Sequence, residues 1–484
     1  MQQLNEREGI EGRAFTVTGG LGFVGSVLCL ALVRRGARSV RSLDLRSSSS
    51  WSDDLQTAGV RCIQGDVSNK KDVERAVGGV DCVFHLASYG MSGKEMIQTQ
   101  LIDKINIGGT CNVIDACFVK GISRLVYVST YNVVFGGKEI VNGNEFLPYF
   151  PIEDHVDSYG RSKSVAEQLV LKSNGRQLKD DKGRMLYTCA VRPAAIYGPG
   201  EERHLPRILS LAKRDLLFFK IGKEDVKTDW VYVDNLVLAL IQASMGLLDD
   251  IPDRKGQRPV ASGQAYFISD GSPINTFDSL IIPLVRSLSY GLPKYTLGVK
   301  DALRLSDFFF VLYIMLFPWL NRPWLPQPLL LPAEVYKVGV THYFSYVKAK
   351  DELGYVPMVS PQDGLAATIS YWQKRKMREL DNPPLYLVLL IVLGMTLLCC
   401  VTYLPPYGPL KYVLAVGLFF FRSQWGLHVL FVSSVIAHVA EALYAWNIAK
   451  RVDSANSKGW FWQTLLVGYP SLRLLKRRQT KQVN

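Results

Sequence analysis

The hydrophobic pattern from residue 14 to about residue 240 alternates short β-branched runs with longer segments of helical periodicity. This alternation is typical of repeated strand–helix–strand units, and it predicts an α/β fold with a Rossmann-type, doubly wound parallel sheet. The expected strands cover residues 14–18, 40–44, 82–86, 125–129 and 188–192.

After residue 240 the pattern becomes irregular, with one compact apolar run at 263–268 and several proline breaks. We expect this region to form a smaller lobe that faces a ligand crevice of the sheet. The sequence therefore predicts three parts: a Rossmann domain over 10–250, the lobe over 251–380 and a helical region over 381–484.

Two later apolar runs differ in length. Residues 308–320 form a 13-residue run closed by Pro318 and Pro323, which falls short of the ~20 residues that span a bilayer. This run is expected to be either a buried helix or an interfacial helix that dips into a membrane. Residues 385–404 carry no charge and lie between two proline pairs, so they predict a transmembrane helix.

Residues 427–446 form a second candidate span although they include His428, His438 and Glu441. Polar groups are costly in lipid, so these side chains are expected to face a partner helix or a cavity. The shorter run 412–421 either extends this hairpin or forms a shallower helix. Basic residues lie on both sides of these segments, which predicts an even number of spans with both flanks in the cytosol.

The formal net charge of +13 raises the question of a nucleic-acid partner. A nucleic-acid reader would gather its basic residues with aromatic side chains on one face, whereas the densest basic runs here flank apolar segments. No nucleic-acid partner is therefore expected. The eight cysteines form no C-x-x-C pair and no metal-ligand spacing with histidine, so we expect reduced thiols and no metal site. The charged amino terminus does not predict a signal peptide.

A glycine-rich turn follows the first expected strand and leads into an apolar helical pattern. Gly19 permits the tight turn, Gly22 lets the backbone approach a pyrophosphate, and Gly25 lets the helix pack close to the strand. Phe23 and Val24 begin the helix, whose amino terminus stabilises phosphate charge. These five residues predict a dinucleotide site.

Asp44 ends the next strand, where a carboxylate can accept hydrogen bonds from the adenosine ribose hydroxyls. A carboxylate there repels a 2′-phosphate, so the expected cofactor is NAD rather than NADP. Arg46 favours NADP instead, unless it is only a solvated loop charge. Asp66 is a candidate for contact with the adenine, with an ordinary turn aspartate as the alternative.

Tyr159 and Lys163 are four residues apart at the start of an expected helix over 158–173, so their side chains share one face. A free tyrosine, with a pKa of ~10, is poorly tuned for proton transfer at neutral pH. A positive charge about 5 Å away would favour the phenolate by roughly 3 kcal/mol at an effective dielectric of about 20. Lys163 is therefore expected to lower the pKa of Tyr159 and to bind the nicotinamide ribose.

The Y-x-x-x-K spacing also occurs at Tyr290, Tyr346 and Tyr407, where coincidence explains it. Tyr159 differs because it follows the strand that ends at Ser129 and Thr130, and ligands of parallel sheets bind at such carboxyl ends. A hydroxyl there is expected to bind the substrate oxygen.

Several motifs occur in order along the chain: TGGLGFVG (18–25), HLA (85–87), ST (129–130), YGRSK (159–163), RPAAIYGPG (192–200), DWVYVDN (229–235) and YFISD (266–270). Together they resemble the extended short-chain dehydrogenases/reductases over residues 10–375. More narrowly they resemble the 3β-hydroxysteroid dehydrogenase branch, which includes decarboxylating sterol dehydrogenases, and most of all short-chain dehydrogenase/reductase family 42E.

The resemblance implies that Tyr159 accepts or donates the proton, that Lys163 is its electrostatic partner and an NAD ligand, and that Asn106 organises the active site. One departure is Tyr131, which occupies the position where many extended relatives place a catalytic serine. We assign the hydroxyl role to Thr130, with its neighbour Ser129 left open.

The resemblance further implies a membrane-bound, NAD-dependent oxidoreductase that acts on the 3β-hydroxyl or ketone of a lipophilic, sterol-like substrate. It implies an endoplasmic reticulum location, with the catalytic domain facing the cytosol. A bilayer partner suits such a substrate because apolar area keeps it out of water. Alternatives are oxidation with loss of a 4-carboxylate, and a dinucleotide-binding scaffold without catalysis, which Tyr131 suggests. The sequence is compatible with an oligomer and does not define the oligomeric state.

Overall fold

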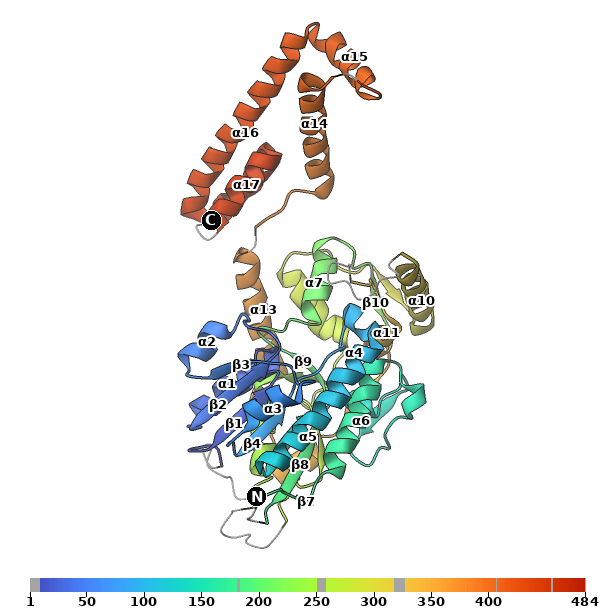
Figure 1. Cartoon of the computed structure of the whole chain (residues 1–484). Helices are drawn as coiled ribbons and strands as arrows, with labels where there is room; N and C mark the ends of the chain where they lie inside the picture. Colours follow the sequence, from blue (N-terminus) through green and yellow to red (C-terminus); the bar gives the residue numbers. More distant parts are fainter. Residues whose placement is uncertain are drawn as a thin grey trace. The chain divides into compact units, whose positions relative to one another are not determined.

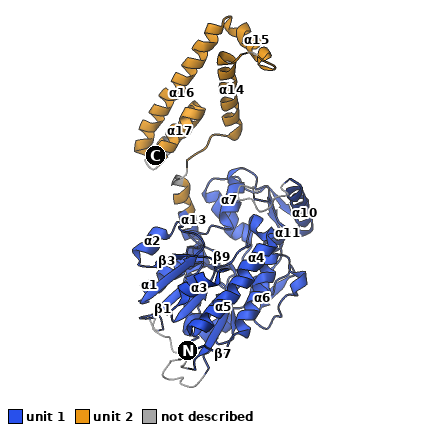
Figure 2. Cartoon of the chain, viewed as in Figure 1, with its two compact units in different colours: residues 1–371 blue, residues 372–484 orange. Residues whose placement is uncertain are grey.

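The computed structural model describes residues 9–180, 183–249, 258–316, 327–378, 380–405, 407–453 and 456–483. The chain divides into two compact units, Met1–Tyr371 and Trp372–Asn484, which Figure 2 colours separately. Helix α13 (Pro361–Arg378) crosses the division.

The first unit is built on a parallel sheet with the strand order β12-β8-β5-β4-β1-β2-β3 (Figure 1). Strand β1 pairs with both β2 and β4, so the order reverses there and creates the switch point at which such sheets bind ligands. A short strand β7 pairs antiparallel with β8. The strands are β1 (Ala14–Thr18), β2 (Ser39–Asp44), β3 (Arg61–Gln64), β4 (Cys82–His85), β5 (Arg124–Val128), β7 (Arg176–Gln177), β8 (Met185–Pro193) and β12 (Ala265–Ile268). The predicted fold class is confirmed.

Two apolar cores cover the two faces of this sheet. One includes residues of α1 (Phe23–Arg34) and α8 (Val233–Met245). The other includes residues of α3 (Lys70–Val77), α5 (Gly109–Lys120) and α6 (Ser158–Lys172). Burial on both faces explains why strands such as β1, whose five residues are all buried, read as continuous β-branched and apolar runs.

Short elements surround the sheet. The paired strands are β9 (Ala195–Tyr197) with β11 (Trp230–Tyr232), β6 (Ile140–Gly143) with β14 (His342–Phe344), and β10 (Phe219–Ile221) with β13 (Tyr295–Leu297). The helices are α2 (Ser52–Thr57), α4 (Thr99–Asp103), α7 (Leu205–Lys213), α9 (Ile282–Ser287), α10 (Val299–Leu316), α11 (Pro332–Gly339) and α12 (Val347–Leu353). The run predicted at 263–268 contains β12, which pairs with β8 in the main sheet. The separate lobe over 251–380 stays a prediction.

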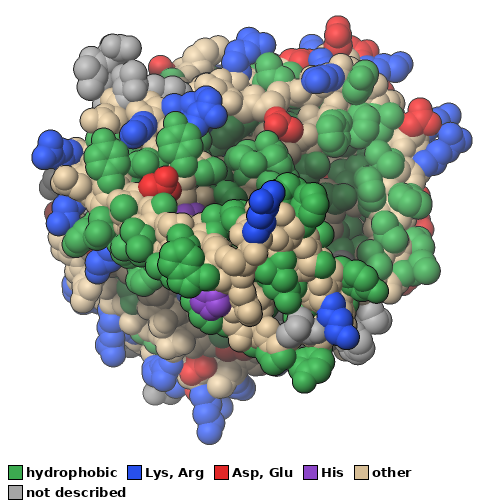
Figure 3. Space-filling model, turned by 90° about the horizontal axis from the view of Figure 1, so that it is seen from above, with side chains coloured by type: hydrophobic (Ala, Val, Ile, Leu, Met, Phe, Trp, Pro, Cys, Tyr) green, Lys and Arg blue, Asp and Glu red, His purple; other side chains and the backbone are tan. Residues whose placement is uncertain are grey.

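Helix α10 contains most of the apolar run predicted at 308–320, of which residues 317–320, with Pro318 and the later Pro323, lie outside the described residues. Its side chains at Phe308, Val311 and Met315 are exposed rather than buried in a core. In the space-filling view of Figure 3, many apolar side chains lie on the surface that is drawn.

The second unit is helical: α14 (Leu385–Tyr403), α15 (Leu410–Phe421), α16 (Gln424–Val452), α17 (Ser457–Val467) and α18 (Tyr469–Val483). By length and composition, α14 and α16 can each cross a membrane, with mean hydropathies of 2.6 and 1.6 over their most apolar windows. The predicted span 427–446 lies within α16, and α14 covers the predicted span 385–404 except for Leu404. His438 and Glu441 line a cavity of about 500 Å³ between α14, α16 and the α17–α18 junction, and His438 Nδ1 bonds to the Leu465 carbonyl at 3.0 Å.

Candidate active site

The glycine-rich turn joins β1 to α1 at the carboxyl edge of the sheet. Gly19 has a φ of +69°, a conformation that favours glycine, and its carbonyl accepts the N–H of Gly22 at 3.0 Å. A Cβ at Gly25 would lie 2.2 Å from the Gly19 carbonyl oxygen, so the turn requires a residue without one. Phe23 and Val24 lie in the first turn of α1. The helix start therefore fits a pyrophosphate.

A Gly25→Ala variant is expected to bind NAD about tenfold more weakly or worse, a loss of at least about 1.4 kcal/mol. The added methyl group must displace the backbone of the turn that receives the pyrophosphate. Isothermal titration calorimetry on the purified full-length protein measures the change. Gly108→Ala is the control, because a Cβ at Gly108 meets nothing within 4 Å. Equal affinities for the Gly25→Ala variant and the wild type would contradict the assignment.

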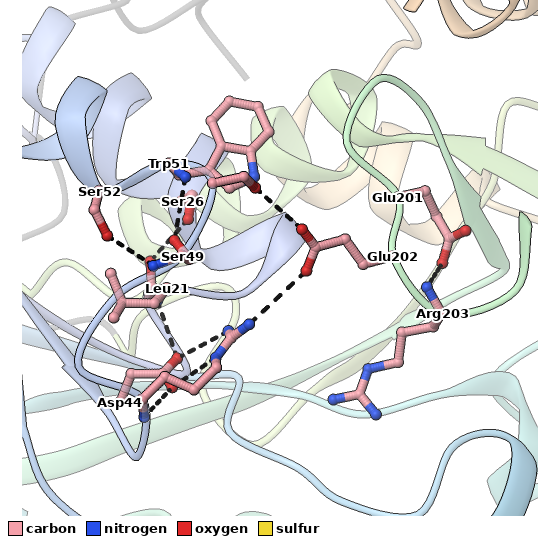
Figure 4. A network of polar contacts seen from close by, with 12 residues as sticks. Leu21, Ser26, Asp44, Ser49, Trp51, Ser52, Glu201, Glu202 and Arg203 are labelled. Atoms are coloured by element: carbon pink, nitrogen blue, oxygen red, sulfur yellow. Dashed lines mark hydrogen bonds and ion pairs between the residues drawn. The ribbon is translucent and has the colours of Figure 1, made fainter. Parts of the chain in front are cut away.

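Asp44, at the end of β2, faces this turn. Its carboxylate accepts the N–H of Leu21 at 3.1 Å and the backbone N–H of Arg46 at 3.0 Å, and the residue is only 8% exposed (Figure 4). The carboxylate thus lies beside the glycine turn, as an acceptor for ribose hydroxyls requires. The Arg46 guanidinium is paired with Asp44, to which its Nε donates at 3.1 Å, and its side chain is 45% exposed, so this loop charge is both paired and partly solvated.

Asp66 lies in the loop after β3 and makes local contacts. Its carboxylate accepts the N–H of Ser68 at 2.8 Å, and its own N–H donates to Asp72 at 3.1 Å. These bonds are those of a turn aspartate. Its contact with the adenine stays a prediction.

Tyr159 and Lys163 lie in the first two turns of α6, and both side chains are buried. Asp157 caps this helix by accepting the N–H of Gly160 at 2.5 Å. The Lys163 ammonium donates to the Val128 carbonyl at 2.5 Å. The helix therefore holds both predicted side chains against the carboxyl end of β5.

Burial controls the proton affinities of this pair. It raises the pKa of Tyr159 to about 12, while the charge of Arg203 and a hydrogen bond with Ser88 act in the opposite direction. Burial also lowers the pKa of Lys163 to about 7, against the attraction of Glu167. Burial is therefore the largest influence on the pKa of both groups. The role of Lys163 as electrostatic partner stays a prediction.

Asn106 connects a loop to the catalytic helix. It lies in a π-helical turn, Lys104–Gly108, and is 1% exposed. Its carboxamide accepts the N–H of Tyr89 at 2.8 Å and donates to the Tyr89 carbonyl at 2.9 Å and to Ser162 Oγ at 2.8 Å. Ser162 in turn donates to the Tyr159 carbonyl at 2.8 Å. Asn106 is thus linked through Ser162 to the backbone of Tyr159, and its role as an organiser of the active site stays a prediction.

The three residues after β5 have different surroundings. Thr130 Oγ1 accepts two bonds from Asn132, at 3.3 Å from its N–H and at 3.0 Å from its amide. Ser129 Oγ is buried and has no hydrogen-bond partner among the described residues. The Tyr131 ring packs 4.9 Å from the His342 ring, within an aromatic cluster. Of the two predicted hydroxyls, that of Ser129 is the one not committed to a local bond.

Three functional candidates escaped the sequence reasoning. Ser88 and Glu95 lie in the segment after β4, and Arg203 lies in the loop before α7; Arg203 donates to Glu95 at 2.7 Å. Ser88 could have been predicted from the sequence, because it follows the HLA motif at the carboxyl end of a strand. Arg203 carries no local signal, since only the tertiary fold brings its charge near Tyr159, and Glu95 is recognised only as the partner of Arg203.

A buried ion pair holds α6 onto the sheet. Arg192 in β8 donates to Glu167 at 2.6 and 2.9 Å, and their side chains are 4% and 0% exposed. The Tyr149 hydroxyl also donates to Glu167, at 2.8 Å. Glu167 lies one helical turn after Lys163, so this pair fixes the segment that carries the catalytic candidates.

Comparisons with known proteins agree with this geometry. The model of the 3-beta hydroxysteroid dehydrogenase/isomerase family matches residues 16–299, and that of Transmembrane protein 254 matches residues 386–477. The chain is 45% identical over 344 residues to short-chain dehydrogenase/reductase family 42E member 1 of Danio rerio. The aligned segment covers 71% of this chain and 84% of the relative. The chain is 33% identical over 374 residues to 3beta-hydroxysteroid-dehydrogenase/decarboxylase isoform 1 of Arabidopsis thaliana, covering 75% and 80%.

Among solved structures, MoeE5 in complex with UDP-glucose and NAD has the same fold, with a TM-score of 0.53 at 20% identity over 75% of this chain and 99% of that one. The predicted relationship to family 42E and the predicted cofactor, NAD, are confirmed. Over the described residues, no group of three His, Cys, Asp or Glu side chains is placed to hold a metal ion. The chain is an NAD-dependent oxidoreductase that belongs to the 3-beta hydroxysteroid dehydrogenase/isomerase family.

Proposed function

We propose that the protein is membrane-bound and oxidises or reduces the 3β-hydroxyl or ketone position of a sterol-like lipid. The observation that carries the proposal is the buried phenol of Tyr159, which lies near a serine hydroxyl and an arginine charge in the unit that holds the dinucleotide turn. Membership of the family supports the steroid class of the substrate.

The side chains of the site divide the work in this proposal, and Lys163 has two tasks. Bound NAD supplies the hydride acceptor or, in its reduced form, the donor. The Tyr159 oxygen takes the hydroxyl proton during oxidation and returns it during reduction. Because burial raises the pKa of the phenol, its deprotonation needs nearby positive charge; Arg203 supplies one such charge, and in this proposal protonated Lys163 supplies a second. Lys163 also binds the nicotinamide ribose, and Ser129 or Thr130 holds the substrate oxygen.

We also propose that α14 and α16 anchor the protein in the endoplasmic reticulum, with the first unit in the cytosol. The length and low polarity of the two helices support this arrangement. So do the basic residues at 374–378 and after residue 449, which the positive-inside rule assigns to the cytosol.

A second candidate is oxidation with loss of a 4-carboxylate. The 3-ketone formed would accept the electron pair released as carbon dioxide leaves. Arg203 favours this reading, because a guanidinium that influences Tyr159 suits a substrate with a carboxylate next to its carbinol carbon. The Arabidopsis relative, named as a dehydrogenase/decarboxylase, supports it as well.

Purified full-length protein with NAD and matched 3β-hydroxysterols, with and without a 4-carboxylate, tests both candidates. NADH formation is followed by absorbance, and carbon dioxide release by isotope label. We expect NADH formation with at least one sterol; label release with the carboxylated sterols alone would select the decarboxylating reaction. Tight NAD binding without turnover of any sterol would contradict both candidates and favour a dinucleotide-binding scaffold without catalysis.

A further inference from the structure

Two loops of the first unit meet beside Asp44. One is the loop 45–51 after β2, and the other is the loop 198–204 before α7. Gly200 approaches Trp51 so closely that a Cβ at Gly200 would lie 2.6 Å from the Trp51 ring. Ser50 Oγ donates to the Glu202 carboxylate at 3.0 Å. Figure 4 shows Glu202 reaching across from the second loop toward the first.

Arg46 lies between two carboxylates in this network. Its guanidinium donates to Asp44 at 3.1 Å from Nε and at 3.3 Å from Nη2, and its Nη1 lies 3.8 Å from Glu202. It also borders the glycine turn, since a Cβ at Gly22 would lie 3.6 Å from Nη2. The cation therefore lies at the position where the adenosine ribose is expected.

The hydrogen-bonding capacity of Asp44 shows why Arg46 needs a second partner. An ionised carboxylate has about four acceptor sites. Asp44 accepts from Leu21, from the Arg46 backbone and twice from the guanidinium. The ribose hydroxyls of NAD can bond to Asp44 only if the guanidinium moves off it. Glu202 offers the displaced cation a carboxylate on the other side.

We propose that Glu202 is a coenzyme-selectivity residue. When the ribose hydroxyls of NAD take the place of the Arg46 guanidinium on Asp44, Glu202 pairs with the displaced cation, so Arg46 is not available to a 2′-phosphate and the adenosine site accepts NAD rather than NADP. Without Glu202, the displaced guanidinium has no second carboxylate and can pair with a 2′-phosphate, the group that a nearby arginine accommodates. The inference rests on the NAD site of the proposed function and is independent of which sterol is used.

Binding of NAD and NADP to the purified full-length protein, measured by calorimetry without substrate, tests this role. We expect Glu202→Gln to tighten NADP binding about tenfold and not to tighten NAD binding. Glu202→Ala should behave alike. In the double variant Arg46→Ala/Glu202→Gln the gain in NADP affinity should vanish, because the gain acts through Arg46.

Asp53→Asn is the matched control, since it removes one negative charge from the neighbouring helix α2, where Asp53 is exposed. An unchanged NADP affinity in both Glu202 variants would overturn the proposal. So would a gain that persists without Arg46, or an equal gain in Asp53→Asn, because either shows a general charge effect. NAD binding with the expected selectivity but no sterol turnover would contradict only the proposed function.

Discussion

Replacing Tyr159 with phenylalanine is expected to lower kcat for NADH formation by about 100- to 10,000-fold, the range that a positioned acid–base group contributes. The hydroxyl is the only group removed, and the ring stays buried at 4% exposure, so folding and NAD affinity are expected to be retained. Steady-state kinetics with an active sterol, beside NAD binding by calorimetry, measures both quantities.

Tyr346→Phe is the control for this variant, because Tyr346 belongs to another Y-x-x-x-K segment and packs against Tyr355 at 5.6 Å between ring centroids. Its activity should match the wild type. Full activity of Tyr159→Phe would show that the proton goes to another group and would remove the catalytic assignment.

Glu167→Gln is expected to destabilise the first unit by about 3–5 kcal/mol, the cost of leaving a buried charge without its partner. Arg192 would keep its charge with its side chain 4% exposed and with only a neutral amide beside it. The midpoint of urea unfolding, followed by circular dichroism of the full-length protein in detergent, reports the loss.

Asp301→Asn is the matched control for the buried pair. Asp301 and Arg304 lie 3.2 Å apart, but their side chains are 63% and 82% exposed, and such pairs contribute about 1 kcal/mol or less. If Glu167→Gln unfolded no earlier than Asp301→Asn, the buried pair would not hold α6 in place.

The alternation of apolar runs predicted the main sheet closely, because its strands are buried on both faces and helices of clear periodicity separate them. Strand β1 has the predicted bounds, 14–18, and α6 begins at the predicted Ser158. The position of β12 beside β8 was not predicted. A four-residue apolar run carries no information about its pairing partner, which the tertiary packing of Tyr266 and Ile268 selects.

The candidate site was predictable where its functional residues lie close together in the sequence. The glycine turn, Asp44 and the Tyr159–Lys163 pair each follow from residues close in sequence. Arg203 and Glu202 were not predictable, since they reach the site only when the loop before α7 folds against other loops. The effect of Lys163 on the pKa of Tyr159 stays a prediction, and burial, which sequence spacing does not measure, is the largest influence on the pKa of each group.

The three hydrogen bonds of the Asn106 carboxamide affect which substitutions this chain can accept during evolution. Two of them satisfy the backbone N–H and carbonyl of Tyr89, and leaving a buried polar group unpaired costs about 1–3 kcal/mol. A descendant that had abandoned chemistry would still lose stability if it replaced this asparagine. Retention of Asn106 among homologues therefore reports selection for the scaffold, whereas retention of the Tyr159 hydroxyl reports selection for turnover.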